Sequence, residues 1–584
     1  MSDARTAAQM AVSTREASAA PPMADATTGF LDERRLLRGP WQAFERDIAR
    51  LLVANGYDDV RVVGGSGDHG GDVLGVLGGK LWVFQCKHTT AGPPPREAII
   101  EVVEAARFYE ADRMVVAVSR PPGDGFNEER ARYERAGLTI DVADPRVLLG
   151  LMARTPEYPP TRKRLRDYQV DASARFREAL LSTGRGQVVL ATGLGKTVVM
   201  AETVADLLRR GAIQGGRVLV LAHTRDLVEQ LHRSFWYQLP RWVPTHQLAN
   251  GESPTFWEGL TFATVQSARA RLDALPDFGL VLVDEAHHIG ADIFQSVVNV
   301  LRPPMLGGAT ATPWRGDGYD LTALLGPPVV RLGVADGLRE GFLSDVDYRL
   351  LADNLNWELV QDKSRHRYSL SQLNRKLILP TRDDEAARAI RSTFDTEKRR
   401  AGIVFSPTIA HAQYFSAMLR QYGFRAETIS SDMPARARDV LMAGFRAGRL
   451  DMVVTVDLFN EGVDVPDVDL VVFMRATHSR RIFVQQLGRG LRVSPLKDRV
   501  IVLDFVTDLR RVAEVVELER AARGGAMEHL MLDGEVVQFN DASAGTFLRE
   551  WLLDQASLFL REDDPMLDVP RFDFPTPPAP GGVQ

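Results

Sequence analysis

The strongest constraint on this chain is the segment Leu190-Ala-Thr-Gly-Leu-Gly-Lys-Thr197, which lies between an apolar run and a predicted helix. A strand, a glycine-rich loop and a helix in this order direct backbone N–H groups and a helix N-terminus at phosphate oxygens. A second apolar run, Leu280-Val-Leu-Val283, ends in Asp284-Glu-Ala-His287 at a distance suited to one nucleotide-binding lobe. Gly-Lys-Thr alone also fits an ordinary turn, but the two segments together predict ATP hydrolysis.

Each residue of these segments has an expected role. Lys196 would reach the β- and γ-phosphates, while the Thr197 hydroxyl and the Asp284 carboxylate would hold Mg²⁺. Glu285 would act on the attacking water. The other loop residues expected to surround the phosphates are Thr192, Gly193, Leu194 and Gly195. The expected cofactors are therefore ATP and Mg²⁺.

Composition narrows the class of protein. The 584 residues suffice for roughly four domains, and a net charge of −6 gives no global basic signature, so any nucleic-acid contact must come from local patches. The one cysteine, Cys86, excludes a disulfide framework and a cysteine-based zinc site. No apolar run approaches the ~20 residues that cross a bilayer, and residues 1–29 lack the pattern of a secretory signal. We therefore expect a soluble cytoplasmic protein without membrane contact.

Further segments have the order and composition of helicase motifs. They are Leu165-Arg-Asp-Tyr-Gln169, Ala222-His-Thr-Arg225, Thr264-Val-Gln-Ser267, Gly308-Ala-Thr-Ala-Thr-Pro313, Phe459-Asn-Glu-Gly-Val-Asp-Val-Pro466 and Gln485-Gln-Leu-Gly-Arg-Gly-Leu-Arg492. With the ATP segments they resemble superfamily 2 helicases of the DEAD/DEAH type, as in the motors of type I and type III restriction enzymes. The resemblance implies that Gln169 contacts adenine and that segments 222–225 and 264–267 contact a nucleic-acid backbone. It also implies that segment 308–313 couples hydrolysis to lobe movement.

The two segments nearest the C-terminus would complete the ATP site from a second lobe. By the same resemblance, Asp464 would contact the ribose or the metal side of the nucleotide. Arg489 and Arg492 lie three residues apart and so share one face of a helix. Guanidinium groups from a facing lobe stabilise charge on the γ-phosphate, which is worth about 10³–10⁵ in rate. Such a site is complete only when the lobes close, so hydrolysis would move the bound strand; a solvated helix face is the alternative for these arginines.

A second candidate site lies near the N-terminus. Apolar residues at helical spacing predict an amphipathic helix, namely Trp41, Phe44, Ile48, Leu51 and Leu52, and Glu45 leans toward its apolar face. A Gly-Gly pair at 78–79 predicts a two-residue hairpin in which residue 77 pairs with residue 80. Counting outward, Asp72 faces Gln85, Lys87 shares their face, and Cys86 points into a core. We expect Glu45 to lie over the face that carries Asp72, Gln85 and Lys87.

This arrangement resembles the Mrr-type branch of PD-(D/E)xK nucleases. The resemblance implies that Asp72 and Gln85 hold Mg²⁺, that Lys87 orients the attacking water, and that Glu45 completes the catalytic set. Gln85 stands where an acidic ligand is commoner, but it fits the Mrr variant. Two alternatives stay open: a hairpin with a chance surface lysine, and a nuclease-like domain that only binds DNA.

The expected fold class is α/β, with a restriction-endonuclease-like domain, two RecA-like parallel-sheet lobes and a helical C-terminal segment. The predicted boundaries are 1–35 for a disordered tail, 36–153 for the nuclease domain, 154–163 for a Pro-rich linker that tethers it, 164–345 for lobe 1, 346–385 for the crossover between lobes, 386–508 for lobe 2, 509–565 for the helical segment and 566–584 for a second disordered tail.

The combination predicts an ATP-driven DNA helicase or translocase with an attached Mg²⁺-dependent endonuclease. It would act on duplex or partly single-stranded DNA, in restriction or phage defence. The alternatives are a DNA repair or recombination helicase whose N-terminal domain only grips DNA, an RNA helicase, and a non-enzymatic scaffold protein.

Overall fold

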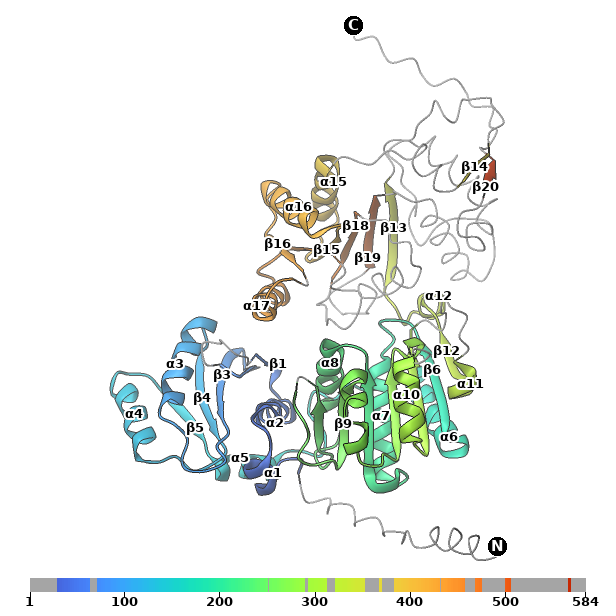
Figure 1. The fold of residues 1–584 in the computed structure, drawn as a ribbon. Coiled ribbons are helices and arrows are strands. Elements are labelled where there is room, and N and C mark those ends of the chain that lie inside the picture. Colours follow the sequence, from blue (N-terminus) through green and yellow to red (C-terminus); the bar gives the residue numbers. More distant parts are fainter. Residues whose placement is uncertain are drawn as a thin grey trace, which may run out of the picture. The chain divides into compact units, whose positions relative to one another are not determined.

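The computed structural model describes residues 29–63, 71–249, 251–288, 292–311, 321–351, 367–369, 383–430, 432–456, 468–474, 499–505 and 566–568. They form two compact units, whose elements are labelled in Figure 1. The first unit contains a five-stranded sheet and most of a seven-stranded sheet, and the second contains a six-stranded sheet. No helix within the described ranges is long and apolar enough to cross a bilayer.

The N-terminal sheet is built around a tight hairpin. Its strand order is β1 (Asp58–Val62), β2 (Val73–Leu77), β3 (Lys80–Lys87), β4 (Arg113–Val118) and β5 (Ile140–Ala143). β1, β2 and β3 pair antiparallel, whereas β3, β4 and β5 pair parallel. Gly78 and Gly79 join β2 to β3 with φ of 59° and 74°, values that favour glycine. Leu77 pairs with Lys80, so the predicted register is confirmed.

Helices cover both faces of this sheet (Figure 1). One layer consists of α1 (Glu33–Arg38), α2 (Trp41–Ala54) and α5 (Pro145–Arg154), and the other of α3 (Glu97–Tyr109) and α4 (Asp124–Arg135). Phe84 and Cys86 of β3 lie in the core under α2, whereas Val83 lies in the core under α3. Because side chains alternate along a strand, Gln85 and Lys87 follow Val83 to the α3 side.

Residues 29–35 are ordered, although the sequence predicts a disordered tail over 1–35. Phe30 and Leu31 are buried in the core under α2. The Phe30 amide donates to the Arg241 carbonyl over 2.7 Å, and the Arg50 guanidinium lies 4.0 Å from the centre of the Phe30 ring. An apolar pair this short carries no periodicity, so its burial was not recognisable from the pattern.

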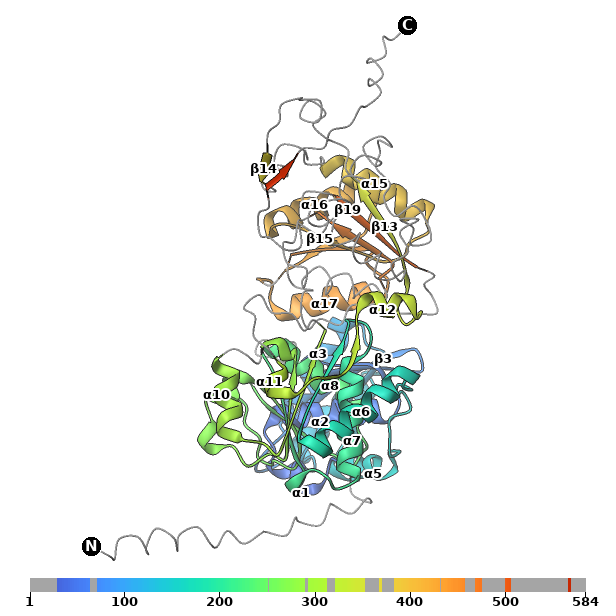
Figure 2. The same cartoon turned by 90° about the vertical axis from the view of Figure 1, so that its right-hand side faces the viewer.

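The seven-stranded sheet forms the first of the two predicted lobes. Its order is β12 (Pro328–Leu332), β6 (Arg185–Leu190), β11 (Met305–Thr310), β10 (Leu280–Asp284), β7 (Arg217–Ala222), β9 (Gly259–Thr264) and β8 (Thr245–Leu248). The run from β11 to β8 is parallel throughout. One core contains residues of α6 (Asp167–Thr183), α7 (Lys196–Arg209) and α8 (Arg225–Trp236). The opposite core contains residues of α9 (Val265–Arg269), α10 (Asp292–Leu301) and α11 (Thr322–Leu325), and Figure 2 shows α10 and α7 on opposite sides of the sheet.

Shorter elements complete this part of the chain. They are α12 (Val334–Arg339) and the 3-10 turns η1 (Gln214–Gly216), η2 (Leu272–Ala274) and η3 (Ala286–His288).

The second unit contains an all-parallel sheet. Its order is β13 (Asp345–Leu351), β19 (Arg499–Phe505), β18 (Leu470–Phe473), β15 (Gly402–Phe405), β17 (Met452–Thr455) and β16 (Ala426–Ile429). Its helices are α15 (Asp383–Thr396), α16 (Ile409–Gln421) and α17 (Ala435–Arg446). β13 falls within the predicted crossover, yet it pairs with β19 as an edge strand.

The predicted C-terminal tail also contains ordered residues. β20 (Met566–Asp568) pairs antiparallel with β14 (Arg367–Ser369), which places Leu567 opposite Tyr368. This is a correction to the disordered tail predicted for 566–584. The helical segment predicted for 509–565 lies outside the described residues.

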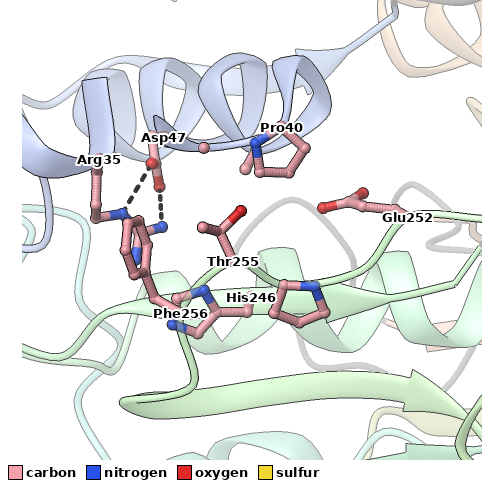
Figure 3. A pocket seen from close by; sticks show the side chains of 10 residues that line it. Arg35, Pro40, Asp47, His246, Glu252, Thr255 and Phe256 are labelled. Atoms are coloured by element: carbon pink, nitrogen blue, oxygen red, sulfur yellow. Dashed lines mark hydrogen bonds and ion pairs between the residues drawn. The ribbon is translucent and has the colours of Figure 1, made fainter. Parts of the chain in front are cut away.

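Within the first unit, α2 packs against the lobe of the seven-stranded sheet through buried charges. Arg35 donates to Asp47 over 3.0 Å and to the Thr245 carbonyl over 3.1 Å. Arg50 donates to the Val243 carbonyl over 2.7 Å and to the Pro240 carbonyl over 3.2 Å. Figure 3 shows the small pocket at this contact, where Arg35 and Asp47 face residues 246–256 of the lobe. It has room for about one water molecule.

The predicted linker is packed rather than free. The Arg241 amide donates to the Glu157 carbonyl over 2.7 Å, and its guanidinium donates to the Thr155 carbonyl over 2.6 Å. Arg162 forms an ion pair of 2.7 Å with Glu202 and stacks over the Tyr158 ring. The polar groups of this Pro-rich segment thus find partners on the lobe.

Candidate active sites

The glycine-rich loop has the backbone shape of a phosphate site. It connects β6 to the first residue of α7, Lys196. Gly193 and Gly195 adopt φ of 91° and 82°, which only glycine adopts without strain. Leu194 is buried, and its amide donates to the Ala191 carbonyl over 3.1 Å, which closes the turn. The loop therefore presents backbone N–H groups beside a helix N-terminus, as an anion requires.

The predicted acidic pair lies at the carboxyl end of β10. Asp284 is the last residue of the strand and is buried. Glu285 adopts φ of 48°, a left-handed conformation that is rare outside glycine. Its Oε2 atom lies 3.3 Å from His287 Nδ1. Backbone strain of this kind gathers at functional positions, where the surrounding structure maintains it.

The segments expected to contact nucleic acid lie at the same edge of the sheet. Leu221 of β7 pairs with Val283 of β10, and Ala222 pairs with Thr264 of β9. Thr224 caps α8 by accepting the Leu227 amide over 3.3 Å, and Thr264 caps α9 by accepting the Ser267 amide over 3.1 Å. Segments 222–225 and 264–267 therefore begin at the same level of the sheet as Asp284, where β10 ends.

Segment 308–313 is described only as far as Ala311. Ala309 pairs with Asp284. A Cβ atom on Gly308 would lie 2.8 Å from the Ala286 Cβ atom and 2.5 Å from the Leu325 Cδ1 atom, so this position requires glycine. Close packing between segment 308–311 and the residues after Asp284 fits a coupling role.

For four other predicted residues of the ATP site, the structure gives little or no geometry. Gln169 accepts the Arg166 amide over 3.0 Å at the start of α6, and its contact with adenine stays a prediction. Asp464, Arg489 and Arg492 lie outside the described residues, so the roles predicted for them stay predictions.

Three of the predicted nuclease residues share the α3 side of the hairpin, by the alternation of side chains along its strands. The Asp72 amide donates to the Phe84 carbonyl over 2.9 Å, and its Oδ2 atom accepts the Cys86 amide over 2.6 Å. Gln85 is 2% exposed. Its Oε1 atom has no hydrogen-bond partner among the described residues. Lys87 Nζ forms an ion pair of 2.6 Å with Glu101 Oε2.

The sequence predicted that Glu45 lies over this face, but its helix covers the other one. It is a buried residue of α2, which covers the opposite face of the sheet. Its charge nevertheless influences Cys86 near the end of β3. Burial raises the pKa of the Cys86 thiol well above its usual value; the charges of Asp72 and Glu45 raise it further, and Lys87 lowers it. The charges of three of the four predicted residues thus influence the pKa of one buried thiol.

The donor set suits a hard divalent cation. A buried amide oxygen without a partner is costly, and carboxylate and amide oxygens are ligands of Mg²⁺ and similar ions. The described residues contain no group of three or more His, Cys, Asp or Glu placed to hold a metal ion. Gln85 is not one of those residue types, and its amide oxygen could serve as a ligand beside the Asp72 carboxylate.

Glu101 is the residue that sequence reasoning missed. It lies on α3 beside Val102, which is buried, and its side chain is 35% exposed. Its position at the margin of the apolar stripe is the only signal in the sequence, and surface glutamates share it. Its contact with Lys87 depends on how α3 packs on β3.

The chain thus combines an N-terminal α/β domain with two parallel-sheet lobes that carry the predicted ATP-site and helicase segments. Three family models match the chain. Residues 36–138 match "Restriction endonuclease" of the Mrr catalytic type, residues 162–315 match "Type III restriction enzyme, res subunit", and residues 385–494 match "Helicase conserved C-terminal domain". The chain therefore contains an Mrr-type restriction endonuclease domain, a domain of the type III restriction enzyme res subunit and a helicase C-terminal domain, in that order.

Individual relatives are similar to part of the chain. The chain is 27% identical over 326 residues to a 51.5 kDa protein of a Lactococcus phage (isolate 7-9), which covers 53% of this chain and 63% of the relative. It is 26% identical over 381 residues to the DNA 3'-5' translocase XPB2 of Sulfurisphaera tokodaii, covering 59% of this chain and 81% of the relative. The chain thus spans less than two thirds of the phage protein.

A solved structure shares the fold. The ATP-dependent Type ISP restriction-modification enzyme LlaBIII, solved bound to DNA, aligns with 88% of this chain and 41% of its own with a TM-score of 0.50. The sequence identity is 16%, so this likeness concerns the fold alone.

Proposed function

We propose that this protein is an ATP-driven DNA translocase that carries its own Mg²⁺-dependent endonuclease and acts in restriction or phage defence. The observation that supports this most is the convergence of Asp72, Gln85 and Lys87 on one face of a hairpin whose domain matches restriction endonucleases. Because that domain packs against an ATP-binding lobe, the chain joins a motor to a cutting site. The DNA would be duplex or partly single-stranded.

In the motor, the loop amides and Lys196 would bind the phosphates of ATP. Thr197 and Asp284 would hold Mg²⁺, and Glu285 would orient the attacking water. Arg489 and Arg492 would stabilise the charge that develops on the γ-phosphate, and Asp464 would contact the nucleotide. Segments 222–225 and 264–267 would hold the DNA backbone at the edge of the sheet where Asp284 lies.

In the nuclease, Asp72 and Gln85 would hold the metal by their side-chain oxygens. When bound, Mg²⁺ would stabilise charge on the phosphate and favour a hydroxide nucleophile. Lys87 would orient the attacking water and offset the charge of the transition state. Glu45 would act from the other side of the strand end. A neutral amide in place of a carboxylate lowers the ligand charge, so we expect weaker metal binding than in a site with two acidic ligands.

The test compares wild type, Lys196→Ala and Asp72→Ala on modified and unmodified plasmid with Mg²⁺ and ATP. Plasmid cleavage and phosphate release are measured in the same tubes. Asp72→Ala should keep DNA-stimulated ATP hydrolysis but lose cutting, and Lys196→Ala should lose hydrolysis. Asp58→Ala, in an exposed position of the same sheet, is the matched control and should behave as wild type.

Intact cutting by Asp72→Ala would remove the nuclease proposal. A wild type that hydrolyses ATP on DNA but never cuts would favour the alternative, a repair or recombination helicase whose N-terminal domain only grips DNA.

A further inference from the structure

The ion pair between Lys87 and Glu101 joins two layers of the N-terminal domain. The Nζ and Oε2 atoms lie 2.6 Å apart, and the two side chains are 27% and 35% exposed. Ion pairs with this exposure contribute little to stability, because water screens them and the side chains lose entropy. The contact is therefore better explained by the orientation that it imposes on Lys87.

Glu101 occupies a fixed position over the hairpin. It belongs to α3, whose residues Ala98, Ile99 and Val102 are fully buried. These residues share a core with Val83 of β3 and Val116 of β4. Because the helix is held by this core, the Glu101 carboxylate has a defined place relative to the end of β3. It lies on the side of the sheet that carries Asp72, Gln85 and Lys87, whereas Glu45 comes from the other layer.

Lys87 needs such a partner if it is to act on water. A lysine side chain has a flexible stem of four carbons, so its ammonium can move toward any nearby carboxylate. Asp72 and Gln85 must keep their oxygens available for a metal. An anion on the α3 side draws the ammonium away from these ligands and holds it in one orientation.

We propose that Glu101 is a positioning residue of the nuclease site, which orients the Lys87 ammonium toward the attacking water. The proposal rests on the endonuclease function proposed above. It separates Glu101 from the metal ligands: removal of its charge should slow the chemical step while leaving the affinity for DNA and metal unchanged. Loss of a contact that orients a catalytic group typically costs about 10–100-fold in activity.

The test uses Glu101→Gln in the full chain, with Glu104→Gln as the matched control on the exposed side of the same helix. Glu101→Gln should lower kcat for plasmid cleavage by about tenfold. The KM for DNA, the Mg²⁺ concentration for half-maximal cutting and the melting temperature should each stay near their wild-type values. Glu104→Gln should match wild type in every measurement.

A second readout does not depend on cutting. An amine-reactive acetylating reagent is applied briefly, and labelling of individual lysines is followed by mass spectrometry. Lys87 should react several-fold faster in Glu101→Gln than in wild type, because its ammonium is no longer held in the ion pair. Lys80, exposed at the other end of β3, is the internal control and should react equally in both.

Each outcome decides the matter. Lower kcat with faster labelling of Lys87 supports the proposal. Wild-type kcat in Glu101→Gln overturns it, as does a higher Mg²⁺ requirement with normal kcat at saturation, which would make Glu101 a metal ligand. A wild-type chain that does not cut would instead overturn the endonuclease function itself.

Discussion

Two buried histidines lie where α2 meets the first lobe. His232 of α8 stacks on Phe262 with ring centres 4.6 Å apart, and neither of its ring nitrogens has a hydrogen-bond partner among the described residues. His246 of β8 is within 2.8 Å of the Glu258 carbonyl. Burial lowers the pKa of both histidines well below the usual value, and the neighbouring arginines lower it further. Both side chains are therefore neutral in the folded protein.

These histidines predict that acid destabilises the first unit. In the unfolded chain a histidine takes up a proton near pH 6.5, whereas the folded form resists protonation. The unfolded state therefore binds more protons below pH 6.5, and the free energy of unfolding falls as pH drops from 7.5 to 5.5. Each such histidine contributes about 1.4 kcal/mol per pH unit below 6.5.

Urea denaturation followed by tryptophan fluorescence measures this loss. His232→Phe should reduce this loss by about 1.4 kcal/mol at pH 5.5, since an aromatic ring replaces a group with no hydrogen bond to lose. An equal loss in wild type and variant would contradict the prediction.

At the scale of elements, α2 contacts both the core of the N-terminal domain and the first lobe. Phe44 and Ile48 pack in the core of the N-terminal domain. Arg46 pairs with Glu252 of the lobe, and Arg50 donates to two of its carbonyls. Burial lowers the pKa of Arg50 to about 9, so the guanidinium remains charged at neutral pH. A buried charge is costly unless it is compensated; here the guanidinium donates hydrogen bonds to two carbonyls, and the Asp47 charge favours its protonated form.

Arg50→Ala should therefore destabilise the first unit. Removal of one member of a buried, charged contact costs about 3 kcal/mol, since Val243 and Pro240 would keep buried carbonyls that lose a donor. Chemical denaturation measures the change, with exposed Arg38→Ala as the control, expected to stay within about 0.5 kcal/mol of wild type. A stability loss no larger than that of the control would show that the contact contributes little.

The hairpin shows which features turn type and strand alternation can predict and which they cannot. The Gly-Gly turn and strand alternation correctly predicted that residue 77 pairs with residue 80 and that Cys86 points into a core. The same rules placed Glu45 over the wrong face, because a helix can cover either side of a sheet. Glu101 was missed for this reason as well: no spacing in the sequence links α3 to Lys87.

At the scale of the molecule, the N-terminal domain packs against the first lobe. Arg241 of the lobe donates to the carbonyls of Ala153 and Thr155, and its own amide donates to Glu157. Segment 154–163 thus lies against the lobe instead of acting as a flexible spacer. The nuclease site would therefore travel at a fixed distance from the first lobe.

The packing of segment 154–163 on the lobe predicts that this segment resists proteolysis. Trypsin should not readily separate the nuclease domain from the motor in the wild type, although segment 154–163 contains arginine and lysine. Arg241→Ala removes the side-chain donor and should speed that cleavage about tenfold, since loss of ~1.4 kcal/mol of local stability raises the open population by that factor. Exposed Arg269→Ala is the control and should be cut at the wild-type rate. Rapid cleavage of the wild type between the two domains would contradict this packing.

What the sequence determined by itself is local: the phosphate loop, the acidic strand end, the hairpin register and the two classes of enzyme that they indicate. These follow from backbone geometry and side-chain alternation over a few residues, which the order of amino acids specifies directly. Only the tertiary structure decided which helix covers the nuclease face, that Glu101 meets Lys87, and that the nuclease is packed on the lobe. The contact between Arg46 and Glu252 joins residues 206 positions apart. Contacts of this kind depend on how buried surfaces fit together, and no local pattern in the chain encodes that fit.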